Sequence, residues 1–148
     1  MNNSIPIACD HAGFSMKEFL KEALNEKGML AKDFGTYSEE SVDYPDFAKA
    51  VCMQVINNEA DFGVLICGTG NGMAMTANKF SSIRAALCWS PEIAGMARKH
   101  NDANILVLPA RFMTFEAALE CMLAFINTDF EGGRHSARIE KMKKVTED

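Results

Sequence analysis

Hydrophobic residues along this chain follow two patterns. Short, almost unbroken apolar runs are typical of strands buried on both faces, and apolar residues at every third or fourth position are typical of helices with one buried face. Runs of the first kind predict strands at residues 5–9, 62–67, 84–88 and 104–109, and the more polar stretch 29–34 predicts a weaker strand. The second pattern predicts helices at about 15–27 and from about 45, 72, 90 and 114, with a tail helix after residue 133.

Residues at the predicted helix ends support these boundaries. Ser15 and Glu18 have the spacing of a capping box at the start of the first helix, and Gly28 is expected to end it. The residues expected to begin or cap the later helices are Pro45, Ser90 with Pro91, and Thr114. The helix after Thr114 is expected to bury Phe115, Ala118, Leu119, Met122, Leu123 and Ile126.

The order of these elements predicts the fold class. Strand and helix alternate about five times with short connections, which indicates a parallel sheet with helices on both faces. No repeat, low-complexity tract or linker interrupts residues 1–148, so a single domain is expected. In such folds ligands bind beyond the carboxyl ends of the strands, where Asp10, Cys67 and Arg111 are expected to lie.

Composition argues against several classes of partner. The net charge is −5 with acids and bases interspersed, so the chain lacks the basic field that nucleic acids and anionic membranes require. The first residues show no secretion signal, and no apolar run approaches the ~20 residues that span a bilayer. Five scattered cysteines without a CxxC pair predict neither a disulfide framework nor a structural zinc site, and a cytoplasmic location is expected.

The stretch VLICGTGNGMAMTANK, residues 64–79, carries a functional signal. Its glycines are spaced GxGxG, position 88 holds a cysteine rather than an acid, and no Gly-Lys-Ser/Thr follows, so neither a dinucleotide fingerprint nor a P-loop is indicated. Glycines at the start of a helix let an anion approach free backbone N–H groups. The turn is therefore either an anion site or a tight connection in which Gly68, Gly70 and Gly72 serve packing alone.

Cys67 ends the predicted strand directly before this turn. A thiol beside the amino terminus of a helix is expected to ionise more easily than a free thiol, and the thiolate acts as a nucleophile or a general base. A nucleophile needs a nearby histidine, for which His100 is a candidate by residue type. Cys52 and Cys121 fall on apolar helix faces and are expected to be core residues.

Histidines and arginines supply further candidates. His11 and His100 have polar neighbours at expected pocket edges and are assigned functional roles, whereas His135 is interpreted as a surface residue or one with satisfied hydrogen bonds. Their spacing matches no recurrent zinc signature, so no metal site is predicted. Arg134 and Arg138 share one face of the tail helix and form either an anion-binding pair or a solvated basic face.

Seven motifs occur in order along nearly the whole chain: CDHAGF, DYPDFA, ICGTGNG, ANK, IRAALC, RKHNDANIL and EGGRHSAR. From about Pro6 to Arg138 they resemble the type B ribose-5-phosphate isomerases, whose wider family includes galactose-6-phosphate isomerase subunits. The resemblance implies a Rossmann-like three-layer α/β/α sandwich that assembles as a homodimer or homotetramer, with sites between subunits. It also implies that no metal, nucleotide or other cofactor is used.

The same resemblance implies an aldose–ketose isomerase of the pentose phosphate pathway, which interconverts ribose 5-phosphate and ribulose 5-phosphate through an enediolate. By position, Cys67 is the expected base, His100 is expected to open the sugar ring, and Thr69 with the turn amides is expected to form the oxyanion site. Contacts to the sugar or its phosphate are expected from Asp10, His11, Gly68, Gly70, Asn71, Gly72, Asn101, Arg111, Arg134 and Arg138.

The sequence also departs from the family pattern. One branch lacks the cysteine and uses a glutamate just after the glycine turn, where this chain has Met73, so Cys67 is the expected base. The stretch LPARFMT around Arg111 differs from the more usual version, which contains glycine. Two alternatives remain. One is an isomerase of allose 6-phosphate or galactose 6-phosphate, the latter needing two different subunits, and the other is a non-catalytic sugar-phosphate-binding module.

Overall fold

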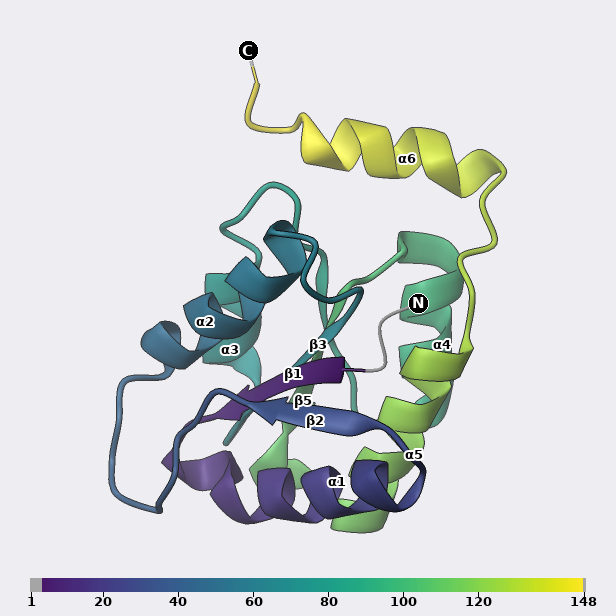
Figure 1. Cartoon of the computed structure of the whole chain (residues 1–148). Coiled ribbons are helices and arrows are strands. Elements are labelled where there is room, and N and C mark those ends of the chain that lie inside the picture. Colours follow the sequence, from purple (N-terminus) through teal and green to yellow (C-terminus); the bar gives the residue numbers. More distant parts are fainter. Residues whose placement is uncertain (1–3, 148) are drawn as a thin grey trace.

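A computed structural model of the chain describes residues 4–147, and a parallel sheet lies at its centre (Figure 1). Within this range the strands are β1 (Ser4–Cys9), β2 (Leu30–Asp33), β3 (Gly63–Cys67), β4 (Ala85–Leu87) and β5 (Ile105–Pro109). They pair in the order β2-β1-β3-β5-β4, and every pair is parallel. The predicted parallel sheet is therefore confirmed.

Helices cover both faces of this sheet. Their bounds are α1 (Phe14–Glu26), α2 (Tyr44–Ile56), α3 (Asn71–Ala77), α4 (Pro91–Asn101), α5 (Phe115–Asn127) and α6 (Arg134–Lys143), with short 3-10 turns η1 (His11–Gly13) and η2 (Ala110–Phe112). Figure 1 shows α1, α4 and α5 on one face, α2 and α3 on the other, and α6 beyond the three layers. This is the expected three-layer α/β/α sandwich with a tail helix.

Two apolar clusters fill the spaces between the layers. Ile7, Ile66 and Leu106 belong to the cluster under α1, α4 and α5. The adjacent strand residues Ala8, Leu65 and Val107 belong to the cluster under α2 and α3. Successive side chains of a strand point to opposite faces of the sheet, so a strand covered on both sides must be apolar throughout. This explains the unbroken runs in the sequence.

Two local predictions were wrong. Ser15 does not cap α1, because Asp10 Oδ1 instead accepts the amides at the start of η1, and the helix continues from that turn without a side-chain cap of its own. The Ser15 hydroxyl donates to Glu39 at 3.2 Å. Phe115 is not buried, since it lies 37% exposed at the first position of α5, and the fully buried aromatic of that helix is Phe125.

Among residues 4–147 no helix is long and apolar enough to cross a membrane.

Lys17 is a fully buried cation beneath the loop that follows β2. Its ammonium group donates to both carboxylate oxygens of Asp33, at 2.6 and 2.8 Å, and to the carbonyl oxygen of Thr36 at 2.7 Å. Lys21 donates to the same carboxylate at 2.7 Å. Burial alone would raise the pKa of Asp33, but hydrogen bonds from the two lysines and a backbone amide outweigh it and lower that pKa. The ion pair thus ties α1 to the end of β2.

We predict that Asp33→Asn lowers the free energy of unfolding by about 3–5 kcal/mol, because it leaves the buried Lys17 with only the half-exposed Glu18, 3.6 Å away, as a counter-charge. Lys17→Met should cost less, about 1–3 kcal/mol, because Asp33 keeps Lys21 and some contact with solvent. Denaturant unfolding at neutral pH measures both values. Equal losses in the two variants would contradict this account of the pair.

The same pair predicts a pH dependence. Because the folded pKa of Asp33 is lowered, its charge stabilises the protein above the ordinary carboxyl pKa of about 4, and this contribution disappears as the pH falls through the lowered value. The difference in unfolding free energy between wild type and Asp33→Asn should therefore shrink below about pH 4. A difference that stays constant down to pH 2 would show that the carboxylate charge is not what stabilises this site.

Candidate active site

The carboxyl ends of β1, β3 and β5 meet at one edge of the sheet and bring three predicted site residues together. Asp10 follows β1, Cys67 ends β3, and Arg111 lies in η2 just after β5. The amide of Asp10 donates to the carbonyl of Ile66 at 3.1 Å, and the amide of Arg111 donates to that of Gly68 at 3.0 Å. Asp10 and Arg111 therefore flank the end of β3. The strand order reverses between β1 and β3, a place where open α/β sheets bind ligands.

Cys67 is 4% exposed, and backbone amides of the glycine turn face its sulfur. Burial raises the pKa of this thiol and the charge of Asp10 raises it further, while the amides of Gly70, Gly72 and Met73 are close enough to lower it. The net shift is upward. The expectation that this thiol ionises easily is therefore wrong, because burial outweighs the amides. What the turn provides is a set of N–H donors around one sulfur atom.

Two glycines of the turn lie where a side chain would collide. Gly70 has a φ of +79°, and a Cβ there would overlap a side chain of β4. A Cβ at Gly72 would lie 2.5 Å from the ring of Tyr44, the first residue of α2. The left-handed backbone favours glycine at position 70, and a side chain at position 72 would have to displace the Tyr44 ring. At Gly68 a Cβ would lie 3.1 Å from Nη1 of Arg111, so the guanidinium group lies directly over the turn.

Tyr44 is a residue of this edge that sequence reasoning missed. Its ring contacts the Gly72 backbone, and its side chain is partly exposed at the rim of the turn. The signal was present in the motif DYPDFA, but an aromatic residue directly before the proline that starts a helix is equally typical of packing.

Polar groups around the turn hold one another in place. His11 Nδ1 accepts the amide of Val42 at 3.3 Å, so the loop between β2 and α2 folds over η1. The hydroxyl of Thr69 accepts the amide of Asn71 at 3.2 Å, and both residues are exposed. The structure therefore brings His11, Thr69 and Asn71 to the same edge as Cys67.

The remaining predicted site residues form a second group at the end of α4 and the start of α6. The rings of His100 and His135 stack with centroids 4.5 Å apart. Arg134 and Arg138 lie close enough to His135 to influence its pKa, and Asn101 follows His100 at the last position of α4. Two arginines thus lie beside the stacked histidines, which favours binding of an anion.

His135 differs from the sequence interpretation. It is buried, and its Nε2 has no hydrogen-bond partner within the described part of the chain, where Glu131 comes no nearer than 4.0 Å. Burial lowers the pKa of His135, and the neighbouring His100 and Arg134 lower it further. The reading of His135 as a surface or satisfied residue is therefore wrong. An unpaired buried nitrogen beside two arginines belongs to the second group.

The two groups lie at opposite edges of the sheet. Cys67 ends β3, whereas α4 runs back along the sheet and ends three residues before β5 begins. Because a strand of five residues spans about 16 Å, His100 cannot reach Cys67 within one chain. The structure therefore does not bring all predicted site residues together in a single copy.

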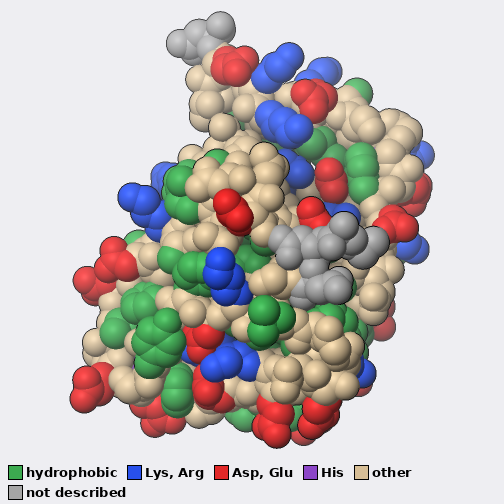
Figure 2. Space-filling view, viewed as in Figure 1, with side chains coloured by type: hydrophobic (Ala, Val, Ile, Leu, Met, Phe, Trp, Pro, Cys, Tyr) green, Lys and Arg blue, Asp and Glu red, His purple; other side chains and the backbone are tan. Residues whose placement is uncertain are grey.

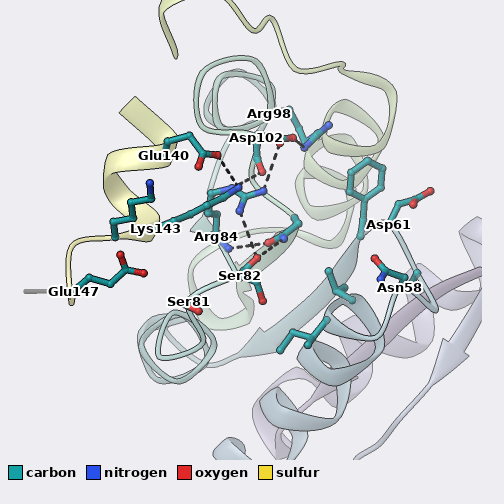
Figure 3. Close-up of a pocket in the computed structure, with 16 residues that line it drawn as sticks. Asn58, Asp61, Ser81, Ser82, Arg84, Arg98, Asp102, Glu140, Lys143 and Glu147 are labelled. Atoms are coloured by element: carbon teal, nitrogen blue, oxygen red, sulfur yellow. Dashed lines mark hydrogen bonds and ion pairs between the residues drawn. The ribbon is translucent and has the colours of Figure 1, made fainter. Parts of the chain in front are cut away.

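Two cavities adjoin α6, away from Cys67. One, of about 590 Å³, is lined by polar side chains that include Arg84, Arg98 and Asp102 (Figure 3). The other, of about 680 Å³, runs along β4 and α4 and includes Asn101. Cys67 lines neither cavity. Figure 2 shows Lys and Arg side chains at the top of the view, over α6, with Asp or Glu side chains among them.

Possible metal ligands are scattered. Among residues 4–147, no group of three or more His, Cys, Asp or Glu side chains is placed to hold a metal ion. The five cysteines all lie in this range, and all are free.

Comparisons with known proteins identify the family. The sequence matches the Ribose/Galactose Isomerase family over residues 5–142. It is 41% identical over 141 residues to ribose-5-phosphate isomerase B of Escherichia coli (strain K12), which covers 95% of each chain.

Solved structures agree with this match. A ribose 5-phosphate isomerase from Thermotoga maritima is 54% identical, with a TM-score of 0.94 over 96% of this chain and 98% of that one. A ribose-5-phosphate isomerase B from Mycoplasma genitalium, solved with bound ribulose-5-phosphate, is 41% identical, with a TM-score of 0.91 over 98% and 97% of the two chains. The chain therefore belongs to the ribose/galactose isomerase family and is an aldose–ketose isomerase with a small-molecule substrate. The resemblance drawn from its seven motifs is confirmed.

We predict that alkylation of Cys67 by iodoacetamide accelerates with pH to a midpoint above the ordinary thiol pKa of about 8.5, because burial and Asp10 raise its pKa. Asp10→Asn should move this midpoint to lower pH, since it removes the charge but keeps the oxygen that caps η1. Mass spectrometry of the Cys67 peptide after timed labelling measures the rate.

The matched control is Asp61→Asn, an exposed acid just before β3, at the far end of the strand from Cys67. It should leave the midpoint unchanged. A wild-type midpoint below about 8.5 would contradict the burial of the thiol, and equal shifts in the two variants would contradict the role of Asp10.

Proposed function

We propose that this enzyme interconverts ribose 5-phosphate and ribulose 5-phosphate in the pentose phosphate pathway. The observation that carries the proposal is the set of turn amides around the Cys67 sulfur, flanked by Asp10 and Arg111. The ribulose-5-phosphate bound to the Mycoplasma genitalium relative and the name of the Escherichia coli relative support this substrate. Five free thiols suit a reducing cytoplasm.

In the proposed reaction Cys67 acts as a base on the open-chain sugar. Its thiolate removes the proton from C2 of the aldose, the electrons of the C2–H bond form a C1=C2 double bond, and the electrons of the C1=O1 double bond move onto O1 to give an enediolate. A proton then passes from O2 to O1, and the thiol returns its proton to C1 as the C2 carbonyl forms. Proton transfer of this kind contributes about 10²–10⁴ in rate.

The turn residues are proposed to stabilise the negative charge. Amides that face the sulfur lower the cost of ionising it, and the amides of residues 68–72 with Thr69 hold the enediolate oxygen. One preorganised donor is worth roughly 3–4 kcal/mol in reactions that develop an oxyanion. Arg111, whose guanidinium group lies over Gly68, adds a positive charge beside the same oxygen. Met73 carries no titratable group, which leaves Cys67 as the proposed base.

A second copy of the chain is proposed to complete the site. His100, which opens the furanose ring in this proposal, and Asn101 lie at the edge of the sheet opposite to Cys67, so they would serve the site of a partner subunit. Exposed apolar side chains support an interface near β4, because Met75, Trp89 and Met96 are each about half exposed or more. A homodimer is the simplest assembly that places both groups together, and a homotetramer built from such dimers contains the same site.

The substrate phosphate is proposed to bind the second group. Arg134 and Arg138 lie four positions apart at the start of α6, and the guanidinium fork suits phosphate oxygens. His135 presents a buried ring nitrogen without a partner beside them. Asp10 and His11 would then contact the sugar hydroxyls from the carboxyl edge of the other chain.

A six-carbon sugar phosphate is the second candidate substrate, because the matching family is described as covering galactose as well as ribose isomerases. Turnover of ribose 5-phosphate, allose 6-phosphate and galactose 6-phosphate by the single purified chain separates the two. The proposal expects the highest kcat/KM with ribose 5-phosphate, and a higher value with either six-carbon substrate would overturn it.

We predict that Cys67→Ala lowers kcat for ribose 5-phosphate by about 10²–10⁴ while KM changes little, because the phosphate contacts remain. Cys52→Ala is the matched control, since Cys52 is equally buried but lies on α2 within the core. It should keep kcat within about twofold and lose only stability. A Cys67→Ala enzyme with near-normal kcat would refute the base assignment.

We predict that two inactive variants restore activity when mixed. If each site uses Cys67 from one subunit and His100 from the other, a heterodimer of Cys67→Ala and His100→Asn contains one intact site. Mixing equal amounts under conditions of subunit exchange should therefore recover about a quarter of the wild-type activity. Two Cys67→Ala preparations that carry different tags serve as the control. No recovery, despite heterodimers seen by native mass spectrometry, would show that the site lies within one chain.

A further inference from the structure

Two arginines close the carboxyl end of α4 (Figure 3). Arg98 is buried, and its Nη1 donates to the carboxylate of Asp102 at 3.0 Å and to the carbonyl of Ala103 at 2.6 Å. Arg84 reaches the same place from the other side, where its Nε donates to the carbonyls of Asp102 at 2.9 Å and Asn101 at 3.2 Å. Carbonyls that end a helix have no partner within it, so these guanidinium groups supply the missing donors.

Asp102 joins the two arginines. One of its carboxylate oxygens pairs with Arg98 at 3.0 Å, and the other lies 3.5 Å from Nη2 of Arg84. Its backbone is left-handed, with a φ of 47°, a conformation that costs a non-glycine residue energy. Glycine is the residue that most often ends a helix in this conformation. The helix end alone therefore does not account for an aspartate here, whereas the bridge between two arginines does.

The same network reaches the segment that leads into α6. Arg98 Nε donates to the carbonyl of Thr128 at 3.1 Å, and its guanidinium group lies 4.6 Å from the ring centroid of Phe62. Three residues after Thr128, the amide of Glu131 donates to the carbonyl of Lys99 at 3.0 Å. The chain between α5 and α6 is thus attached to the last turn of α4, the turn that carries His100.

We propose that Arg84, Asp102 and Arg98 form a clamp that positions His100 and Asn101 for the reaction. This inference rests on the proposed function, in which His100 opens the sugar ring. The three clamp residues are positioning residues: they fix the backbone at positions 101–103 and so the direction in which the preceding histidine projects. Loss of the clamp should therefore lower kcat because His100 is displaced, and it should leave the stability of the fold nearly unchanged.

The variant Asp102→Gly separates an effect on the position of His100 from an effect on the stability of the fold. Glycine keeps the left-handed helix end and relieves its strain, so the melting temperature should stay within a few degrees of wild type. The substitution removes the carboxylate that bridges the two arginines and leaves their hydrogen bonds to backbone carbonyls. Asn58→Gly is the matched control, because Asn58 also has a positive φ, of 59°, and lines the same cavity, but it follows α2 and is not one of the three clamp residues.

The experiment measures kcat and KM for ribose 5-phosphate in wild type, Asp102→Gly, His100→Asn, the double variant and Asn58→Gly. The clamp predicts that Asp102→Gly lowers kcat about tenfold with little change in KM, as expected for a displaced catalytic group. In the double variant the loss should equal that of His100→Asn alone, because the clamp acts through the histidine. Asn58→Gly should match wild type.

Three results would overturn the inference. If Asp102→Gly keeps the wild-type kcat while His100→Asn is strongly impaired, the clamp hypothesis is wrong but the proposed function stands. Losses that multiply in the double variant would show that Asp102 acts independently of His100. Wild-type kcat in His100→Asn would overturn the proposed role of His100 itself, and with it the inference that depends on that role.

Discussion

The direction of the strands constrains where each functional group of this molecule can lie. Because the strands of the described sheet run parallel, each helix between two strands must run back and end at the amino edge. Groups that follow strands, such as Asp10, Cys67 and Arg111, therefore gather at one edge, and groups that end a helix, such as His100 and Asn101, gather at the other. A reaction that uses both sets needs two copies of the chain. The proposed shared site is thus a consequence of topology.

Opposing influences set the pKa of Cys67, the proposed base. The turn places amides around the Cys67 sulfur, yet burial and Asp10 raise the pKa of the thiol above its ordinary range. Catalysis by the thiolate is therefore expected to depend on what the substrate and the partner subunit add to this edge. The positive charge of Arg111, already over the turn, is the nearest contribution from within the chain.

Much of the fold could be predicted from the sequence, because buried parallel strands and amphipathic helices leave strong patterns. The strands, the cap at Ser90 and the end of α1 at Gly28 were predicted for physical reasons that hold in the structure. The start of α1 was not, because Asp10 satisfies the free amides through an extra 3-10 turn that Ser15 and Glu18 do not reveal. Local capping signals cannot show that a preceding turn already satisfies the free amides at the start of the helix.

The motifs supplied the candidate residues but not their arrangement in space. The sequence motifs contain Cys67, His100 and the arginines. The separation of Cys67 from His100 across the sheet, however, depends on the path of α4. The burial of His135 and the rise in the pKa of Cys67 both depend on packing between distant segments, which local sequence does not encode. Tyr44 was missed because its contact with Gly72 joins two different helices, which the local pattern around either residue does not show.

A cross-linking measurement tests the shared site most directly. Thr69 and Arg134 are both exposed and lie in different halves of the proposed site. Thr69→Cys on a tagged chain and Arg134→Cys on an untagged chain are mixed and treated with a short bifunctional thiol reagent. A covalent heterodimer that forms only when both variants are present is the expected result. No heterodimer, together with an internal cross-link when both substitutions are placed in one chain, would contradict the account.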